Sequence, residues 1–363
     1  MRALLATAGL LVLAGSALAG RPTAHTLRKS AGGPIEAIAQ DNNLAAWFAS
    51  GTRPCNEVHV MSPGKKDRSV PPPSSDSMTC NWDITGGQSQ LAIAGRMSTA
   101  LWTLHETGPS SFDQVVAASF GGPERQLERF THATNGIGDW LGGVAGAGKT
   151  LAYSWIDVEY VDPVACLSGA SCKEKLADGG IRVVERQGTK YTYSPLPGAK
   201  PALQVAAAAG RIAYVPALTV KSGRPSANTN SPIYIVDADN GDPVGQAFVR
   251  GIPIAIALSS RVLAVLTTQD GPYDRISWFS ATDGTRLGST LVSALAAPQL
   301  AANKRAIVYR VGHVLRDVST RNGRIRKLAQ TGQNWVGLSL AHNRLIWAEN
   351  HNHTGRLRTL TVG

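Results

Sequence analysis

The segment Gly143–Thr150 reads GVAGAGKT and fits the pattern G-x-x-x-x-G-K-[ST] letter for letter. In nucleotide hydrolases the backbone N–H groups of this loop hold phosphates, the Lys neutralises them and the Ser or Thr binds magnesium. That chemistry requires a buried strand before the loop and a helix after it. Lys149 and Thr150 instead open TLAYSWIDVEYV, a β-branched and aromatic run without the apolar spacing of a helix. We therefore interpret Gly143–Thr150 as a chance match in a turn between two strands.

Other groups of reactive side chains are also better explained as parts of loops and turns than as functional sites. His351 and His353 stand two residues apart and would share one face of a strand, as metal ligands do, but we interpret them as part of a polar loop. The segment Asp237–Asp242 resembles the start of a calcium loop, yet no Glu closes it, and a hairpin turn explains it better. The acidic residues of Asp157–Asp162 have no partner for acid–base chemistry. We expect no catalytic residue, no metal and no cofactor.

The N-terminus has the pattern of a secretory signal. Arg2 precedes an apolar run, and the sequence SALA ends at Ala19 in the A-x-A form that signal peptidases recognise. The alternative is an uncleaved membrane anchor. No later segment approaches the roughly 18 apolar residues that span a bilayer. We divide the chain into a signal peptide, residues 1–19, and a single domain, residues 20–363, exported to the periplasm, the cell envelope or the extracellular space.

The cysteine count agrees with export, because an even number in an exported chain indicates disulfides. The four cysteines allow three pairings. Local pairing is favoured, since each pair then lies within one small unit of sequence, and a zinc site lacks the C-x-x-C spacing. The predicted bridges are Cys55–Cys80 and Cys166–Cys172.

The net charge of +11 is distributed unevenly along the chain. From Ala301 onward, eleven Lys and Arg residues stand against only Asp317 and Glu349, so this part alone carries +9. The densest segment, RNGRIRK, suits an acidic partner. The alternative is a solvated turn whose long side chains cover neighbouring strands. The candidate basic patch consists of Arg321, Arg324, Arg326 and Lys327.

An internal repeat organises the chain. Its clearest element is a short run rich in Ala, Val, Trp and Tyr, which recurs at spacings close to those of propeller blades. We call each copy an anchor segment. The copies are NNLAAWFAS from Asn42, STALWTLHE from Ser98, KTLAYSWIDV from Lys149, GRIAYVPAL from Gly210, SRVLAVLTT from Ser260, KRAIVYRVG from Lys304 and NRLIWAEN from Asn343.

In several copies a further apolar run follows the anchor segment, and a tight turn follows that run. Asn240-Gly241, Asp283-Gly284 and Asn322-Gly323 hold equivalent places, and such dipeptides are typical of type I′ hairpins. Each unit therefore predicts four antiparallel strands that bury their faces only by radial stacking.

The predicted fold is all-β: a β-propeller of about seven four-stranded blades. The last unit supplies only three strands, and its fourth would be missing. The segment Pro22–Lys29 alternates as a half-buried strand does and has no hairpin partner of its own. We expect this N-terminal strand to complete the last blade and close the propeller.

Two segments carry a resemblance to known families. LAAWFASGTRPCNEVHVMSPGKK, Leu44–Lys66, resembles the repeat of TolB-like propellers, and ISWFSATDGTRLGS resembles the strand and turn of quinoprotein-like and YVTN-type propellers. The quinone-binding members carry a Trp soon after that turn, whereas Val244 and Leu287 lie there in this chain. The resemblance implies protein binding in the cell envelope, with no catalytic residue and no quinone cofactor.

These observations predict an exported, non-enzymatic binding or scaffold module that acts as a monomer. We expect a protein or acidic polymer as its partner, not a nucleic acid, and no transmembrane span after signal removal. The alternative is a propeller enzyme, a lyase or hydrolase, with a site in the central channel. A catalytic cluster at equivalent strand starts would favour it, but the eight His residues are scattered.

We expect the mature protein to begin at Gly20, because small residues at Ala17 and Ala19 suit signal peptidase. Intact-mass spectrometry of the protein exported by its native host measures this directly. A species that retains Met1 would contradict the cleavage.

Overall fold

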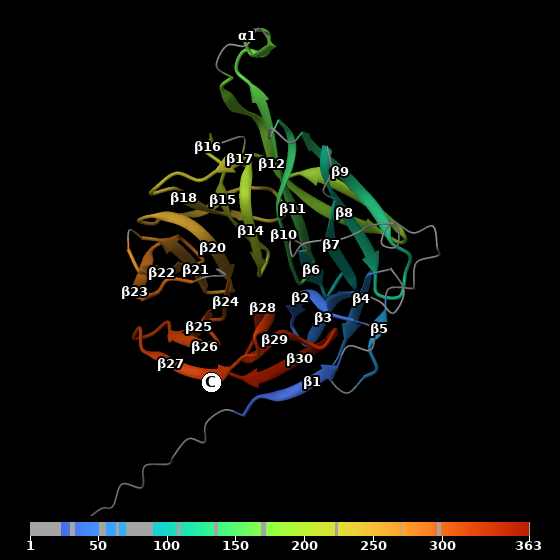
Figure 1. Cartoon of the computed structure of the whole chain (residues 1–363), viewed down its shortest axis with the longest axis vertical. Coiled ribbons are helices and arrows are strands. Elements are labelled where there is room, and N and C mark those ends of the chain that lie inside the picture. Colours follow the sequence, from blue (N-terminus) through green and yellow to red (C-terminus); the bar gives the residue numbers. More distant parts are fainter. Residues whose placement is uncertain are drawn as a thin grey trace, which may run out of the picture.

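The β-sheets of the protein are arranged like blades around a central axis (Figure 1). The computed structural model describes residues 23–29, 33–50, 56–62, 65–69, 90–106, 110–133, 137–167, 172–221, 224–269, 271–295 and 299–362. Among these residues the one helix, α1 (Pro163–Leu167), is a short turn, and no helix has the length and hydropathy to cross a membrane. The predicted signal sequence lies outside the described residues. The all-β propeller predicted from the sequence is confirmed.

Five sheets contain four antiparallel strands each. In the last of them the N-terminal strand lies outermost, next to β30. Their strands are β2 (Ile35–Asp41), β3 (Leu44–Ser50), β4 (Asn56–Met61) and β5 (Arg68–Ser69); β14 (Ala202–Ala208), β15 (Arg211–Pro216), β18 (Pro232–Asp237) and β19 (Pro243–Phe248); β20 (Ile252–Leu258), β21 (Val262–Thr268), β22 (Tyr273–Ser280) and β23 (Arg286–Ser293); β24 (Leu300–Ala302), β25 (Ala306–Val311), β26 (Val314–Ser319) and β27 (Ile325–Gln330); and β28 (Asn334–Ala341), β29 (Arg344–His351), β30 (Thr354–Thr361) and β1 (His25–Lys29).

The prediction of about seven four-stranded blades is wrong, because the structure shows five. The repeat predicts two separate blades between residues 91 and 195, but β9 and β10 are long enough for His132 to pair with Gly138. This pairing joins the strands into one eight-stranded sheet. Its members are β6 (Leu91–Ala94), β7 (Thr99–Glu106), β8 (Ser110–Ser119), β9 (Arg125–Ala133), β10 (Gly138–Ala147), β11 (Thr150–Tyr160), β12 (Glu174–Gln187) and β13 (Lys190–Pro195). A separate hairpin, β16 (Thr219–Lys221) and β17 (Arg224–Ser226), lies between β15 and β18.

Every anchor segment forms a strand, and the fourth residue of each strand is fully buried. Adjacent residues on one strand pack against different neighbouring sheets. On β3, Trp47 packs with Leu357 of the last sheet, while Phe48 packs with Trp102 of the eight-stranded sheet. Both faces of a sheet are therefore removed from water, each against another sheet. The fourth residues are Trp47, Trp102, Tyr153, Tyr214, Val265, Tyr309 and Trp347.

The predicted hairpins after the third strands are present, but their turns are not of type I′. Only the glycine adopts a positive φ, 77° at Gly284, whereas Asp283 before it does not. Gly284 N–H donates to the carbonyl of Ser280 at 3.0 Å, and the equivalent bonds close at Gly241 and Gly323. Each turn is thus a longer loop that ends in a left-handed glycine.

The N-terminal strand closes the propeller as predicted. β1 pairs with β30, with Thr26 opposite Arg358. A second contact joins the last sheet to the first, because the Asn350 amide accepts from the N–H of Ile35 and donates to its carbonyl, both at 2.8 Å. Gly355 N–H also donates to the carbonyl of Gly33. Closure thus uses backbone and side-chain bonds between opposite ends of the chain.

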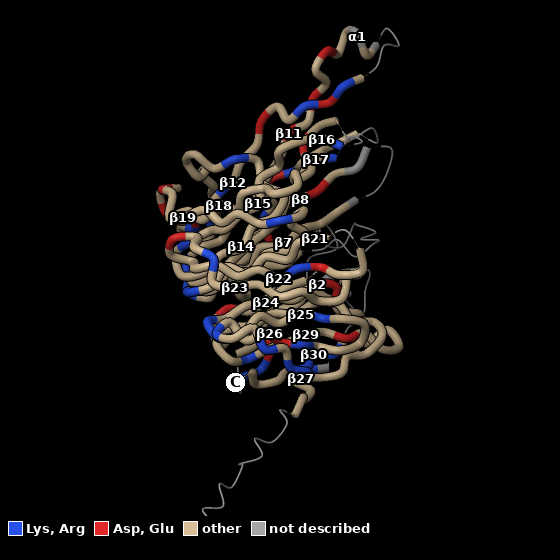
Figure 2. Tube along the Cα trace, turned by 90° about the vertical axis from the view of Figure 1, so that its left-hand side faces the viewer, with Lys and Arg blue, Asp and Glu red and all other residues tan. Residues whose placement is uncertain are grey.

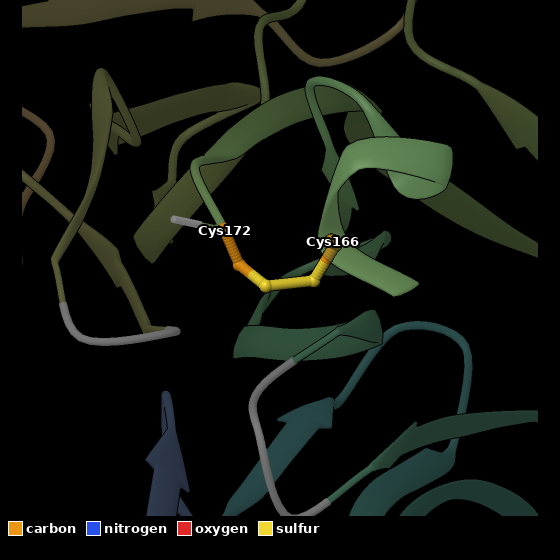
Figure 3. The surroundings of a disulfide bond; sticks show 2 residues. All are labelled: Cys166 and Cys172. Carbon is orange, nitrogen blue, oxygen red and sulfur yellow. A yellow bond between two sulfur atoms is a disulfide. The ribbon is translucent and has the colours of Figure 1, made fainter. Parts of the chain in front are cut away.

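A long hairpin of β11 and β12 projects beyond the sheets and ends in α1 (Figure 1). The predicted disulfide between Cys166 and Cys172 is present near the tip of this hairpin, with the two Cα atoms 4.8 Å apart (Figure 3). Val161 and Val164 beside the bridge are 57% and 74% exposed. Cys55 and Cys80 lie outside the described residues, so their pairing stays a prediction.

Deleting residues 20–29 should lower the melting temperature measurably, although roughly 1 kcal/mol corresponds to 2–4 °C only in a domain of about 150–250 residues and to less in a larger one. The deletion exposes the edge of β30 and removes Leu27 from its cluster with Trp47. Differential scanning calorimetry measures the change. A chain that starts at Thr23 keeps β1 and is the matched control, and equal melting of the two chains would refute the stabilising role of β1.

Candidate binding face at the channel mouth

The P-loop-like segment forms a β-hairpin. β10 ends at Ala147, Gly148 turns with φ 61°, and Thr150 begins β11 opposite Ala147. The segment therefore runs from strand to strand, and among the described residues no helix directly follows it. Lys149 Nζ lies 2.9 Å from the Asp239 carboxylate in an exposed ion pair. Its interpretation as a turn between two strands is confirmed.

This hairpin instead belongs to the wall of a central channel. The strands nearest the axis are β2, β6, β10, β14, β20, β24 and β28, and each contacts the next around the ring. They enclose a cavity of about 1020 Å³. The turns that follow these strands form one mouth of the channel, because residues such as Asn42, Gly148 and Asn343 line the same cavity.

One buried carboxylate ties three of these turns together. Asp41, which is 7% exposed, accepts hydrogen bonds from the N–H groups of Gly95 at 2.7 Å and Gly148 at 2.8 Å. The N–H of Arg96 in turn donates to the carbonyl of Gly148. The turns after β2, β6 and β10 are thereby fixed relative to one another, and the charge of Asp41 is directed into the protein.

The opposite side of the mouth is linked by side-chain amides. Asn303 accepts from the N–H groups of Arg305 and Ala306, both at 2.8 Å, and donates to the carbonyl of His342. His342 Nε2 lies 3.1 Å from Asn42 Oδ1. This set connects the turns after β24 and β28 to the turn that holds Asp41. Hydrogen bonds therefore join the turns after β24, β28, β2, β6 and β10 into one continuous part of the mouth.

The side chains that remain at the mouth are cationic. Asp41 is the one carboxylate among the described residues that line the cavity, whereas Arg96, Lys149, Lys304 and Arg305 also line it. Lys149 has Asp239 as its partner. The other three are exposed and have no carboxylate partner in the described part of the chain. An anion that enters the mouth meets these charges unneutralised.

The predicted basic patch extends this mouth. The N–H and hydroxyl of Thr320 donate to the carbonyls of Arg305 and Lys304 at 2.9 and 3.1 Å, so the turn after β26 lies beside the turn after β24. This places Arg321 and Arg324 next to the channel rim. We call Arg96, Lys304, Arg305, Arg321 and Arg324 the basic face. Figure 2 shows Lys and Arg residues gathered near β26 and β27.

The other two members of the predicted patch do not join this face as free charges. Arg326 Nη2 lies 2.5 Å from Asp317, a carboxylate with 0% exposure, and this contact raises the pKa of Arg326. Lys327 lies farther along β27, opposite Arg316. The acidic turn Asp237–Asp242 follows β18 and bounds the basic face on one side, with Asp237 accepting from N–H groups of its own turn.

Sequence reasoning missed the cations at the rim, although the repeat contains a signal for them. Several anchor segments begin with a cation just after the turn at the channel mouth. Because a cation recurs at the first residue of this strand or directly before it, the sequence places these charges at one end of the propeller. The residues at this position are Lys149, Arg211, Arg261, Arg305 and Arg344.

A second cluster of reactive side chains lies at the far ends of β7 and β9. His105 Nδ1 is 2.7 Å from Asp113, its cross-strand neighbour on β8. His132 stacks on Trp140 with ring centroids 3.9 Å apart, and burial lowers the pKa of its imidazole. These residues lie outside the lining of the channel cavity. This cluster is not predictable from the sequence, because its members meet only through strand pairing.

The acidic residues noted in the sequence stand along the projecting hairpin. Asp157 lies opposite Asp139 on β10 and Asp178 on β12, and burial together with these charges raises its pKa. Glu159 pairs loosely with Lys175 at 3.7 Å. His353 occupies the turn between β29 and β30 with a φ of 61°. Within the described ranges, no group of His, Cys, Asp or Glu is arranged to hold a metal ion.

Comparisons with known proteins support the fold alone. No protein-family model matches the chain, and no curated protein matches it. One similar structure belongs to a mitotic checkpoint complex, at 12% identity over 98% of each chain with a TM-score of 0.50. Others are the WD40 domain of Neurospora crassa Pan2, at 10% identity over 90% of this chain and 89% of that chain, and the Dos1 propeller, at 9% identity over 94% and 95%, each with a TM-score of 0.46.

Asp41→Ala should destabilise the protein by about 1–3 kcal/mol, because it leaves the N–H groups of Gly95 and Gly148 without their acceptor. Urea unfolding followed by circular dichroism measures the loss. Asp283→Ala is the control, since that carboxylate caps only its own exposed turn through Thr285, and we expect a smaller effect. An equal loss in both variants would show that Asp41 does not link the turns.

Proposed function

We propose that this protein is an exported, non-enzymatic binding module that holds an acidic segment of a protein partner on its basic face. The observation that carries the proposal is the set of uncompensated cations around the channel mouth. Arg96, Lys304 and Arg305 stand on a frame that is already hydrogen-bonded, so little order is lost when a ligand binds. Complementary charge steers an acidic partner toward such a face.

The distribution of the acids supports the same partner. In the region after residue 300, the carboxylate of Asp317 is taken by Arg326, and Glu349 accepts from the indole of Trp347. The described carboxylates of this region are thus engaged inside the protein, while Arg321 and Arg324 stay exposed beside the rim. The face therefore repels cations and attracts an extended acidic chain.

Two features support export. The segment before Gly20 has the form of a cleavable signal, and the disulfide between Cys166 and Cys172 suits an oxidising compartment. The TolB-like resemblance of Leu44–Lys66 supports a role as a monomeric binding module in the cell envelope. Within this proposal the projecting hairpin is a second rigid element at the edge of the sheets.

The alternative, an enzyme with a site in the channel, would need acid–base groups that face one another in the described cavity lining. The groups in the cavity lining with ordinary acid–base roles are Asp41 and His342. Asp41 accepts two backbone N–H groups, and His342 contacts Asn42. Both residues therefore connect turns and do not face a common substrate position.

The proposal is tested with fluorescein-labelled poly-L-glutamate, whose binding is followed by fluorescence anisotropy at low and at moderate salt. We expect saturable binding that weakens with salt, because exposed charges are screened. The double variant Arg321→Ser/Arg324→Ser should weaken binding about tenfold at low salt, since two charges of the rim are lost.

The matched control removes two charges elsewhere. Arg250 follows the far end of β19 and Lys173 lies near the tip of the long hairpin, and both are exposed. Arg250→Ser/Lys173→Ser changes the net charge equally and should bind within about twofold of the parent. If both double variants lose affinity equally, attraction follows net charge alone and the assignment of the face is wrong.

A further inference from the structure

The wall of the channel combines aliphatic side chains with polar ones, among them Gln40 and Ser339. Each strand nearest the axis contributes at least one aliphatic side chain that is partly exposed to the cavity. These side chains also pack against the buried clusters between the sheets, so their positions are fixed. The wall residues are Ile38, Leu91, Val144, Val205, Ile256, Leu258, Leu300 and Leu340.

Small residues keep the channel open between these side chains. β14 contributes a run of alanines, Ala206–Ala208, and other axial strands contribute Ala39, Ala145 and Ala301. The cavity of about 1020 Å³ lies at the upper end of the roughly 300–1,000 Å³ that small-molecule sites enclose. Apolar surface of this kind gains free energy when a hydrocarbon displaces water from it, at roughly 25 cal/mol per Å².

The aliphatic side chains and the cations occupy different parts of the cavity. The aliphatic wall lies along the strands, whereas the cations stand in the turns where the strands end. Arg96 and Arg305 belong to turns that lie apart on the rim, after β6 and after β24. The one lining carboxylate, Asp41, is engaged with Gly95 and Gly148. A ligand that matches this arrangement has an apolar chain and one anionic end.

We propose that the channel binds a single-chain anionic amphiphile, a long-chain carboxylate, with its hydrocarbon chain along the wall and its head group at the cationic rim. The ligand is held at the head by Lys304 and Arg305, which are adjacent in the turn after β24, and along the chain by the aliphatic side chains of the wall. This inference rests on the proposed function in that the head group uses part of the basic face. It adds a ligand class that an acidic protein segment does not represent.

The test is isothermal titration calorimetry of the mature protein with hexadecanoate below its aggregation concentration. We expect saturable binding of one molecule per chain. Leu258→Gln places an amide in the wall and should weaken binding at least about tenfold, which corresponds to 1.4 kcal/mol. Leu287→Gln is the matched control, because Leu287 on the outermost strand β23 is 53% exposed and lies outside the cavity lining.

A second variant keeps the test decisive. If Leu258→Gln fails to fold by circular dichroism, Ala207→Phe fills the channel without adding a polar group and should abolish binding. Hexadecyltrimethylammonium, with the same chain and a cationic head, should bind at least about tenfold more weakly than hexadecanoate. Failure of hexadecanoate to bind, equal binding by wall and control variants, or equal affinity for both head groups would each overturn the inference.

The same variants distinguish the channel site from the acidic-partner site, because each site is measured with its own ligand. Leu258→Gln and Ala207→Phe should retain poly-L-glutamate binding, because their side chains are remote from Arg321 and Arg324 in the turn after β26. Loss of hexadecanoate binding with retention of poly-L-glutamate binding supports the channel site. Binding of poly-L-glutamate by the parent protein without binding of hexadecanoate refutes the amphiphile alone. Binding of hexadecanoate without poly-L-glutamate refutes the acidic protein partner alone.

Discussion

The structure depends on the burial of both faces of every sheet against another sheet. A twisted antiparallel sheet with apolar residues on both faces is unstable alone, and radial stacking satisfies all faces at once. The second strand of each unit shows how the sequence meets this requirement. Trp47 and Phe48 are adjacent in sequence, yet they pack with different neighbouring sheets. The channel, the turns at its mouth and the charges on those turns all follow from this ring.

Much of this arrangement is visible in the sequence because it depends on local patterns. The anchor segments predict strands through their composition, the Asn-Gly and Asp-Gly pairs predict hairpins, and the short spacing between Cys166 and Cys172 predicts their bridge. The P-loop-like segment is recognised as a turn for the same reason, since the residues after Lys149 have strand composition. Ring closure was predictable as well, because one strand was in surplus at the N-terminus and one was missing at the other end.

What the sequence does not determine is how far neighbouring strands extend. The count of about seven four-stranded blades fails because His132 pairs with Gly138, a contact between strands that the repeat assigns to separate units. The left-handed glycine at Gly284 shows a similar limit, since the same dipeptide suits several hairpin loops. The basic face depends on which turns meet around the axis. A linear pattern identifies Arg321 and Arg324 but gives no reason to place Arg96 at the same end of the channel.

The pairing of β1 with β30 has a consequence for the order of events in the cell. A ribosome makes β1 before the other described strands of the propeller and β30 after them. Thr26 therefore cannot pair with Arg358 until every intervening sheet has been synthesised. Contacts of such long sequence separation form late, because the loop between them must first be ordered. Until β1 pairs with β30, the sheets form an open arc with two unpaired edges. The ring can therefore close only after all the sheets between β1 and β30 are in place.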